Sequence, residues 1–215
     1  MREGTPRAGP DAVPPPAEPG HPPRRRPRPG SPDATDAGQR ARLIDALVTV
    51  VAEKGYLRTT VGQVESTAGL PENAFNAHFR DLDECFLAAY RRGTEVLLAG
   101  VEAAYRAEPS WPAGIRAGLR VVLELVAAEP AFARTCLIEA SVAGPRVHRA
   151  RLAFLAKFRS YLSGPDVPQV PDVIRDAVIG GVYTMIYNYV ESDRTAELPG
   201  LLDPLTDFTL MFFRG

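Results

Sequence analysis

The chain has 215 residues, of which 45% are hydrophobic, and a formal net charge of −1. This length suits one large domain or two small ones, and the apolar fraction suits a packed core. The apolar runs are too short and too often interrupted by charges to span a membrane, and the N-terminus has no apolar core of a signal peptide. We therefore expect a cytoplasmic protein with no membrane partner.

The first 35 residues are rich in proline and arginine. They hold eleven of the 21 prolines and no aromatic residue. Such a segment cannot bury enough apolar surface to offset its ordering entropy, so residues 1–35 are predicted to be a disordered arm. The arginine-rich run 24–28 is suited to contacting phosphates or a minor groove. A solvated tail without a specific partner is the other interpretation.

A helical pattern begins at Asp36. Apolar residues recur at helical spacing and are followed by Gly55, a typical C-terminal stop. The recurring residues are Leu43, Ile44, Leu47, Val48 and Val51. The sequence therefore predicts a first helix that ends at Lys54.

Two short helices are predicted next. Thr60 and Gln63 have the spacing of a capping box, and Gly69 is expected to end the helix that they begin. Pro71 is tolerated in the first turn of a third helix, whose Phe75 and Phe79 face the first two. Two short helices after a longer one, joined by a turn with glycine, are typical of a helix-turn-helix, whose second short helix enters the major groove of DNA.

A long fourth helix is expected from Asp81, which caps it, to about Ala107. Proline and glycine then separate five further predicted helices, at about 111–128, 131–143, 146–163, 171–192 and 200–213. No segment alternates with a period of two over a useful length, so no strand is expected. The predicted class is all-α, with about nine helices.

The outward face of the third helix carries the candidate base contacts. If Phe75 and Phe79 face the core, then Glu72, Asn73 and Asn76 face outward together with Ala77. Asparagine pairs with adenine, and a carboxylate accepts from the amino group of cytosine. Thr60, at a helix start, is placed to hold a phosphate. The charge opposes this interpretation, because residues 36–90 carry five basic and eight acidic side chains.

The stretch from Thr59 to Tyr90 strongly resembles the DNA-binding segment of the TetR family of transcriptional regulators. The matching residues are Gly55, Thr60, Val64, Ala68, Gly69, Leu70, Phe75, His78, Phe79 and the run 84–90. The resemblance continues more weakly through 136–140 and the last two helices. It implies a three-helix helix-turn-helix domain at 36–81 and a helical ligand-binding and dimerisation domain at 82–215. The DNA-binding residues that it implies are Arg58, Thr60, Pro71, Glu72, Asn73, Asn76, Ala77, His78 and Arg80.

The chain departs from the family pattern at positions that usually contact phosphate. A tyrosine is usual where this chain has Asn76, and a lysine is usual where it has Leu82. Each loss is expected to weaken DNA binding and flatten its salt dependence. Two interpretations stay open: a sequence-specific regulator in which other cations compensate, or a TetR-like scaffold with weakened DNA binding that acts as a ligand- or protein-binding module.

The resemblance also implies an effector pocket in the C-terminal domain. Small-molecule sites in helical bundles are apolar clefts with a few polar groups, and the chain has aromatic residues on the apolar faces of several predicted helices. The candidate residues are Trp111, Phe132, Glu139, Phe154, Phe158, Tyr183 and Tyr187. Ordinary core packing is the alternative for each of them. The small molecule itself is not identified by the sequence.

The last two helices resemble the dimer interface of the family. Their apolar residues exceed what one monomer easily buries, so a homodimer through these helices is expected. A two-fold dimer would place two recognition helices about one turn of DNA apart, on a pseudo-palindromic operator. The family pattern implies a repressor that a ligand releases from DNA.

The sequence does not favour an enzyme. It has no nucleophile elbow, no phosphate loop and no cysteine with a plausible histidine partner, so no catalytic residue and no cofactor are predicted. The three histidines lack metal-ligand spacing, and no metal site is expected. Cys85 and Cys136 lie in apolar stretches and are expected to be buried, reduced thiols.

Overall fold

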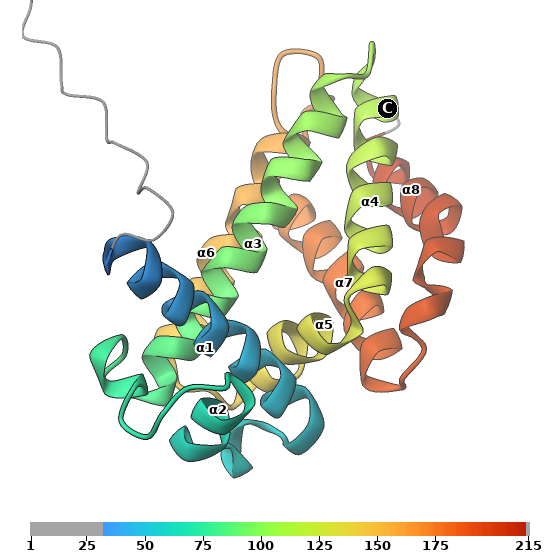
Figure 1. The fold of residues 1–215 in the computed structure, drawn as a ribbon. Helices are drawn as coiled ribbons and strands as arrows, with labels where there is room; N and C mark the ends of the chain where they lie inside the picture. The colour runs from blue at the N-terminus through green and yellow to red at the C-terminus, as the bar shows by residue number, and fades with distance from the viewer. Residues whose placement is uncertain (1–31, 214–215) are drawn as a thin grey trace, which may run out of the picture.

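The computed structural model describes residues 32–213, and every regular element within that range is a helix (Figure 1). The eight α-helices are α1 (Pro32–Lys54), α2 (Val61–Thr67), α3 (Leu82–Arg106), α4 (Trp111–Ala128), α5 (Pro130–Leu137), α6 (Pro145–Lys157), α7 (Asp172–Glu191) and α8 (Leu202–Met211). Five 3-10 helices connect them: η1 (Tyr56–Arg58), η2 (Phe75–Ala77), η3 (Glu139–Ser141), η4 (Phe158–Leu162) and η5 (Thr195–Leu201). The all-helical class expected from the sequence is confirmed.

The N-terminal part, called the head here, comprises residues 32–81 and forms one end of the molecule (Figure 1). α1 ends where Gly55 takes a positive φ of 82°. The predicted capping box of α2 is present, because Thr60 Oγ1 accepts from the Gln63 N–H and Gln63 Oε1 accepts from the Thr60 N–H. Side chains of α1, α2, η2 and the start of α3 share one buried core.

Two boundaries of the head differ from expectation. α1 begins at Pro32, earlier than the expected Asp36 and inside the segment assigned to the arm. The arginine-rich run 24–28 lies outside the described residues. The third segment is not the expected α-helix, because it contains turns and only the short η2. Asn73 takes a φ of 69° there, which an α-helix does not accommodate, so regular helix cannot extend from Pro71 through Phe75.

The C-terminal part, called the body here, is built around the antiparallel pair α3 and α4 (Figure 1). α8 packs against α4, α7 contacts α5 and α8, and α6 packs against α3. α5 lies between the head and the body, in contact with α1, α4 and α7. No helix of residues 32–213 is long and apolar enough to cross a membrane.

Buried side chains of the body form two further clusters. One joins α4, α5, α7 and α8. The other joins α4, η4 and α7 through Ile115, Leu162 and Val178. The core of the head extends into the body through Cys136 of α5, Ala140 of η3 and Val147 of α6. The head and the body are therefore connected by packed apolar contacts as well as by α3.

Candidate functional site

Eight of the nine predicted DNA-binding residues are exposed on the head. The buried Phe75 and Phe79 hold the segment 71–80 against α1 and α3. The turns of this segment then expose the residues between and beside the two rings. The exposed residues are Arg58, Thr60, Pro71, Glu72, Asn73, Asn76, Ala77 and Arg80. Exposure is a requirement for touching DNA, and this group, called the recognition face here, meets it.

His78 is the one predicted DNA-binding residue that does not face outward. Its side chain is only 2% exposed and packs against α1, where Nδ1 lies 3.5 Å from Asp36 Oδ1 and Nε2 lies 3.3 Å from Gln39 Oε1. Both partners belong to the first turns of α1. His78 is therefore placed to join η2 to α1 rather than to contact a ligand of the recognition face.

A buried carboxylate supports the recognition face from behind. Glu65, which is 5% exposed, accepts a hydrogen bond of 2.9 Å from the Phe75 N–H through Oε1. This bond satisfies a backbone donor at the start of η2. On the exposed side, Arg80 donates to Glu84 Oε2 from both its backbone and its guanidinium, so the cation nearest η2 is already paired.

The body contains an apolar cavity of about 150 Å³ between α3, α4, α5, α6, α7 and η4. Gly93, Gly114 and Gly118 lie along its walls, where side chains of neighbouring helices come close to the glycine backbone. Its lining is almost entirely carbon. An apolar cavity of this size is suited to an apolar ligand rather than to water.

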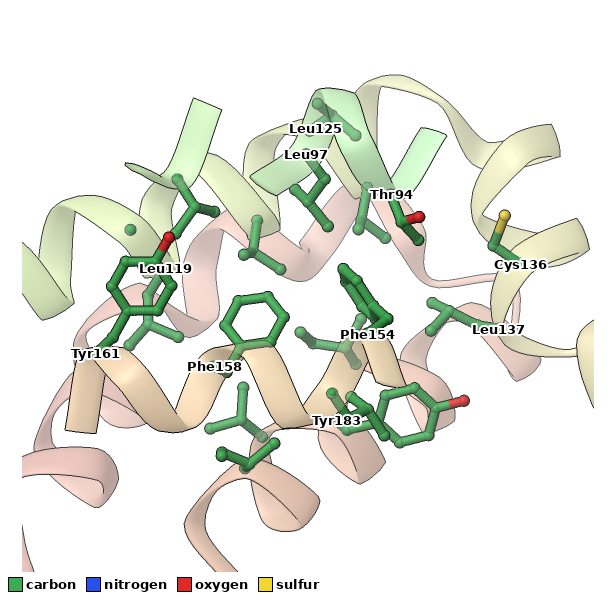
Figure 2. A pocket seen from close by; sticks show the side chains of 18 of the residues that line it. Thr94, Leu97, Leu119, Leu125, Cys136, Leu137, Phe154, Phe158, Tyr161 and Tyr183 are labelled. Carbon is green, nitrogen blue, oxygen red and sulfur yellow. The ribbon is translucent and has the colours of Figure 1, made fainter. Parts of the chain in front are cut away.

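The polar atoms of the cavity lie at its two ends (Figure 2). Thr94, Cys136 and Tyr183 lie at one end and Tyr161 at the other, with Phe154 and Phe158 between them. The Tyr161 hydroxyl donates to Glu102 Oε2 at 2.6 Å, and burial together with this bond raises the pKa of Tyr161 to about 12. The phenol is therefore un-ionised at neutral pH and provides no charge inside the cavity.

The structure brings together four of the seven predicted effector-pocket residues. Phe132, Phe154, Phe158 and Tyr183 line the cavity. The other three lie elsewhere. Trp111 donates through Nε1 to the Tyr161 carbonyl and packs on Phe213. Tyr187 donates to Glu191 away from the cavity.

Glu139 belongs to the junction between head and body. Its Oε2 accepts a hydrogen bond of 2.8 Å from the Tyr56 N–H of η1. The Tyr56 hydroxyl donates to Asp83, and burial, followed by this bond, raises the pKa of Tyr56. Arg146 of α6 pairs with Asp81 at 3.0 Å. Two polar links thus tie the head and the start of α3 to η3 and α6.

Sequence reasoning missed most of the cavity. Its aliphatic lining, such as Leu97 and Val122, has the same periodic pattern as a filled core and carries no separate signal. Tyr90 and Thr94 were unremarkable helical residues in the sequence. Glycines inside helices, such as Gly93, were an available signal, because a glycine inside a helix is unfavourable unless another group must come close. A Cβ at this position would overlap the Phe132 ring.

Comparison with known proteins gives a family for the head and a fold for the described chain. Residues 43–89 match the model of the bacterial regulatory proteins of the tetR family. A search of curated proteins finds no match. Among residues 32–213 no group of histidine, cysteine and carboxylate side chains is arranged to hold a metal ion.

Three solved structures resemble most of the described chain. The fatty acid degradation regulator FadR from Bacillus halodurans is 16% identical, with a TM-score of 0.72 over 80% of this chain and 94% of that one. FadR from Bacillus subtilis, solved in complex with stearoyl-CoA, is 16% identical, with a TM-score of 0.70 over 79% and 96%. A regulatory protein of the tetR family from Rhodococcus RHA1 is 17% identical, with a TM-score of 0.64 over 80% and 96%.

These likenesses agree with the order of elements described above. The matched residues run from α1, through α2 and the recognition face, into the first part of α3. The structural likeness extends over the body as well. Residues 43–89 therefore resemble the bacterial regulatory proteins of the tetR family, and most of the described chain has the fold of the solved regulators named above.

Proposed function

We propose that this protein is a sequence-specific DNA-binding transcriptional regulator whose affinity for its operator is set by an apolar small molecule bound in the cavity. The observation that carries the proposal is the recognition face, which lies within the family match and exposes Glu72, Asn73 and Asn76 together. Amide and carboxylate side chains of this kind read base edges in the major groove. The Thr60 hydroxyl, which is exposed at the start of α2, can donate to a phosphate.

The cavity supports the effector half of the proposal. It lies among the helices of the body, and its lining suits a hydrocarbon group. The similar FadR from Bacillus subtilis was solved with stearoyl-CoA. By analogy, an acyl compound is the class of effector that we propose to test first.

Regulation would follow from a shift between two arrangements of the head. α3 contributes Asp83 to the junction and Tyr90, Thr94 and Leu97 to the cavity, so one helix contacts both. An effector that binds better when α3 is displaced would favour that arrangement. Release from DNA, and hence repression relieved by the effector, is the direction that the family pattern favours.

The proposal includes a homodimer through α7 and α8. Residues on these helices that the monomer leaves exposed include Met185, Met211 and Phe212. Beside them, α7 exposes the small residues Ala177 and Gly180, which permit close helix packing. A two-fold arrangement would present two recognition faces to a pseudo-palindromic operator.

The test is selection of random duplex DNA by the purified protein at one near-physiological salt concentration. The comparison variant carries Asn73→Ala and Asn76→Ala. Enrichment of a pseudo-palindrome by the wild type, weakened in the variant, supports the proposal. If a folded, dimeric wild-type protein enriches no sequence, DNA reading is not its function.

A second candidate function is a tetR-like scaffold that binds a ligand or a protein partner and has little affinity for DNA. It is favoured by the charge of the head and by Asn76 and Leu82, where phosphate-contacting residues are usual in the family. The left-handed Asn73 and the short η2 add to this, because they leave no full helix for the major groove. The DNA selection separates the two candidates.

A further inference from the structure

An arginine without a carboxylate partner lies against Tyr183, which lines one end of the cavity, although the arginine itself is not part of the lining. The Arg151 guanidinium of α6 lies 5.9 Å from the centre of the Tyr183 ring, and its Nη1 donates to the Tyr183 hydroxyl at 3.4 Å. Tyr183 lines the cavity. Nη2 lies 3.3 Å from His148 Nδ1. Arg151 Nε is buried and has no hydrogen-bond partner within residues 32–213.

The elements around Arg151 do not neutralise it. α6 carries four basic residues, Arg146, Arg149, Arg151 and Lys157, and no aspartate or glutamate. On α7 the carboxylate of Glu191 accepts from Tyr187, and in the described part of the chain Arg151 forms no ion pair. A partly buried guanidinium without an anion is costly, so its surroundings favour an anion that can pair with it.

The opposite end of the cavity lacks such an excess of charge. There Glu102 accepts from the Tyr161 hydroxyl and pairs with Arg106 at 2.5 Å, so positive and negative groups balance. The middle of the cavity, between Phe154 and Phe158, presents carbon (Figure 2). The cavity is thus apolar in its middle, neutral at the Tyr161 end and positive beside Tyr183.

We infer that Arg151 binds the anionic group of an amphipathic effector, an aliphatic carboxylate whose hydrocarbon chain fills the cavity. The inference rests on the effector role proposed above and assigns the chemistry of that effector. A carboxylate has one negative charge and two oxygens, and it can accept from Nε and an Nη group of one guanidinium together. The carbonyl of a coenzyme A thioester is uncharged, so a ligand of that class could pair with Arg151 only through its distant phosphates.

The experiment measures binding of dodecanoate, dodecan-1-ol and dodecanoyl-CoA to the full chain by isothermal titration calorimetry. The variants are Arg151→Met, which keeps length without charge, and Arg151→Lys, which keeps the charge. Arg149→Met, at an exposed position on the same helix, is the matched control. Melting temperatures establish that each variant is folded.

Loss of the charged hydrogen bonds should weaken dodecanoate binding about tenfold or more in Arg151→Met, with a smaller loss in Arg151→Lys. Arg149→Met should bind dodecanoate as the wild type does, and dodecan-1-ol should bind equally well to all the proteins. If Arg151→Met binds dodecanoate as tightly as the wild type, the role of Arg151 is overturned while the cavity remains an effector site. Tighter binding of dodecanoyl-CoA, unchanged in Arg151→Met, would overturn the carboxylate assignment.

Failure of all three compounds to bind the wild type would contradict the effector role of the cavity, and the inference with it. The DNA selection described above does not depend on an effector. Its result therefore separates a failure of the DNA-binding proposal from a failure at Arg151.

Discussion

At the scale of single residues, the absence of a side chain at Gly93 determines how closely α3 and α5 approach. Phe132 occupies the space that a Cβ would take, and the same ring lines the cavity. The close contact therefore positions an aromatic ring that the proposed effector would touch. The wall of the cavity depends on a residue that contributes almost no surface of its own.

We expect Gly93→Ala to destabilise the protein by about 1–3 kcal/mol, because the added methyl group forces Phe132 and α5 to move. Urea denaturation measures the change, and binding of an apolar fluorescent probe should weaken in parallel. Gly62→Ala, where a Cβ meets nothing within 4 Å, is the control and should cause no such loss. Equal stability of the two variants would contradict the close packing at Gly93.

The two cysteines are expected to be unreactive in the folded protein. Burial raises the pKa of the Cys85 thiol to about 12, and burial also raises the pKa of Cys136. A thiol whose pKa is far above the solution pH holds little of the reactive thiolate. Reaction with a chromogenic disulfide reagent at pH 8 should be slow for the native chain and should account for two thiols in denaturant. Native labelling as fast as that of the denatured chain would contradict burial of the thiols.

At the scale of elements, α5 and η3 connect the cavity with the head. Phe132, Cys136 and Leu137 line the cavity, and Glu139, immediately beyond, accepts from the Tyr56 N–H. Thr135 Oγ1 also lies 3.4 Å from the Val48 carbonyl of α1. If filling the cavity displaces α5, we therefore expect η1 to move with it, and α2 to move with η1.

We expect Glu139→Ala to weaken the coupling between effector and DNA. Removing the acceptor leaves the Tyr56 N–H without its partner, so movement of α5 is transmitted less well to η1. The coupling is measured as the ratio of the operator affinities with and without saturating effector. This ratio should fall severalfold, while the affinity for the effector itself changes little. Glu124→Ala, at an exposed position on α4, is the control. Coupling that is unchanged in Glu139→Ala would remove this link from the mechanism.

Local sequence signals predicted the elements well where local physics determines them. α4 has the expected bounds, and Asp81 caps α3 by accepting from the Glu84 N–H. The third helix was not predictable in this way, because a left-handed Asn73 and a hydrogen bond from the Phe75 N–H to the Glu65 carboxylate decide its form. The position of His78 depended equally on partners that another helix supplies.

The site was predictable only in part, for a related reason. Aromatic residues such as Phe154 and Phe158 suggested a pocket, and they do line one. Whether an apolar face is filled or hollow depends on packing between helices, which periodicity does not record. Arg151 resembled any other basic residue of a solvated helix until its surroundings were known.

At the scale of the whole molecule, α7 and α8 leave apolar side chains uncovered. Met185 is 42% exposed, Phe212 41% and Met211 54%. These residues lie on the surface proposed as the dimer interface, and a second copy would remove them from water.

We expect the double variant Met185→Asp and Phe212→Asp to be monomeric, because the two charges of each subunit would have to lose their hydration at the interface. Sedimentation velocity at micromolar concentration should show a dimer for the wild type and a monomer for the variant. Leu57→Asp changes an exposed apolar residue of the head and should remain dimeric. A wild-type monomer at this concentration would contradict the proposed assembly.

The bond from the Tyr56 N–H to Glu139 makes the joint between the two parts observable in solution. A backbone amide whose acceptor belongs to the other part exchanges its hydrogen for deuterium only when that joint opens. Its exchange rate, followed by mass spectrometry or NMR, therefore measures how often the joint opens, without DNA and without an attached probe. The same amide, followed while the cavity is filled, would report whether effector binding opens the joint or closes it.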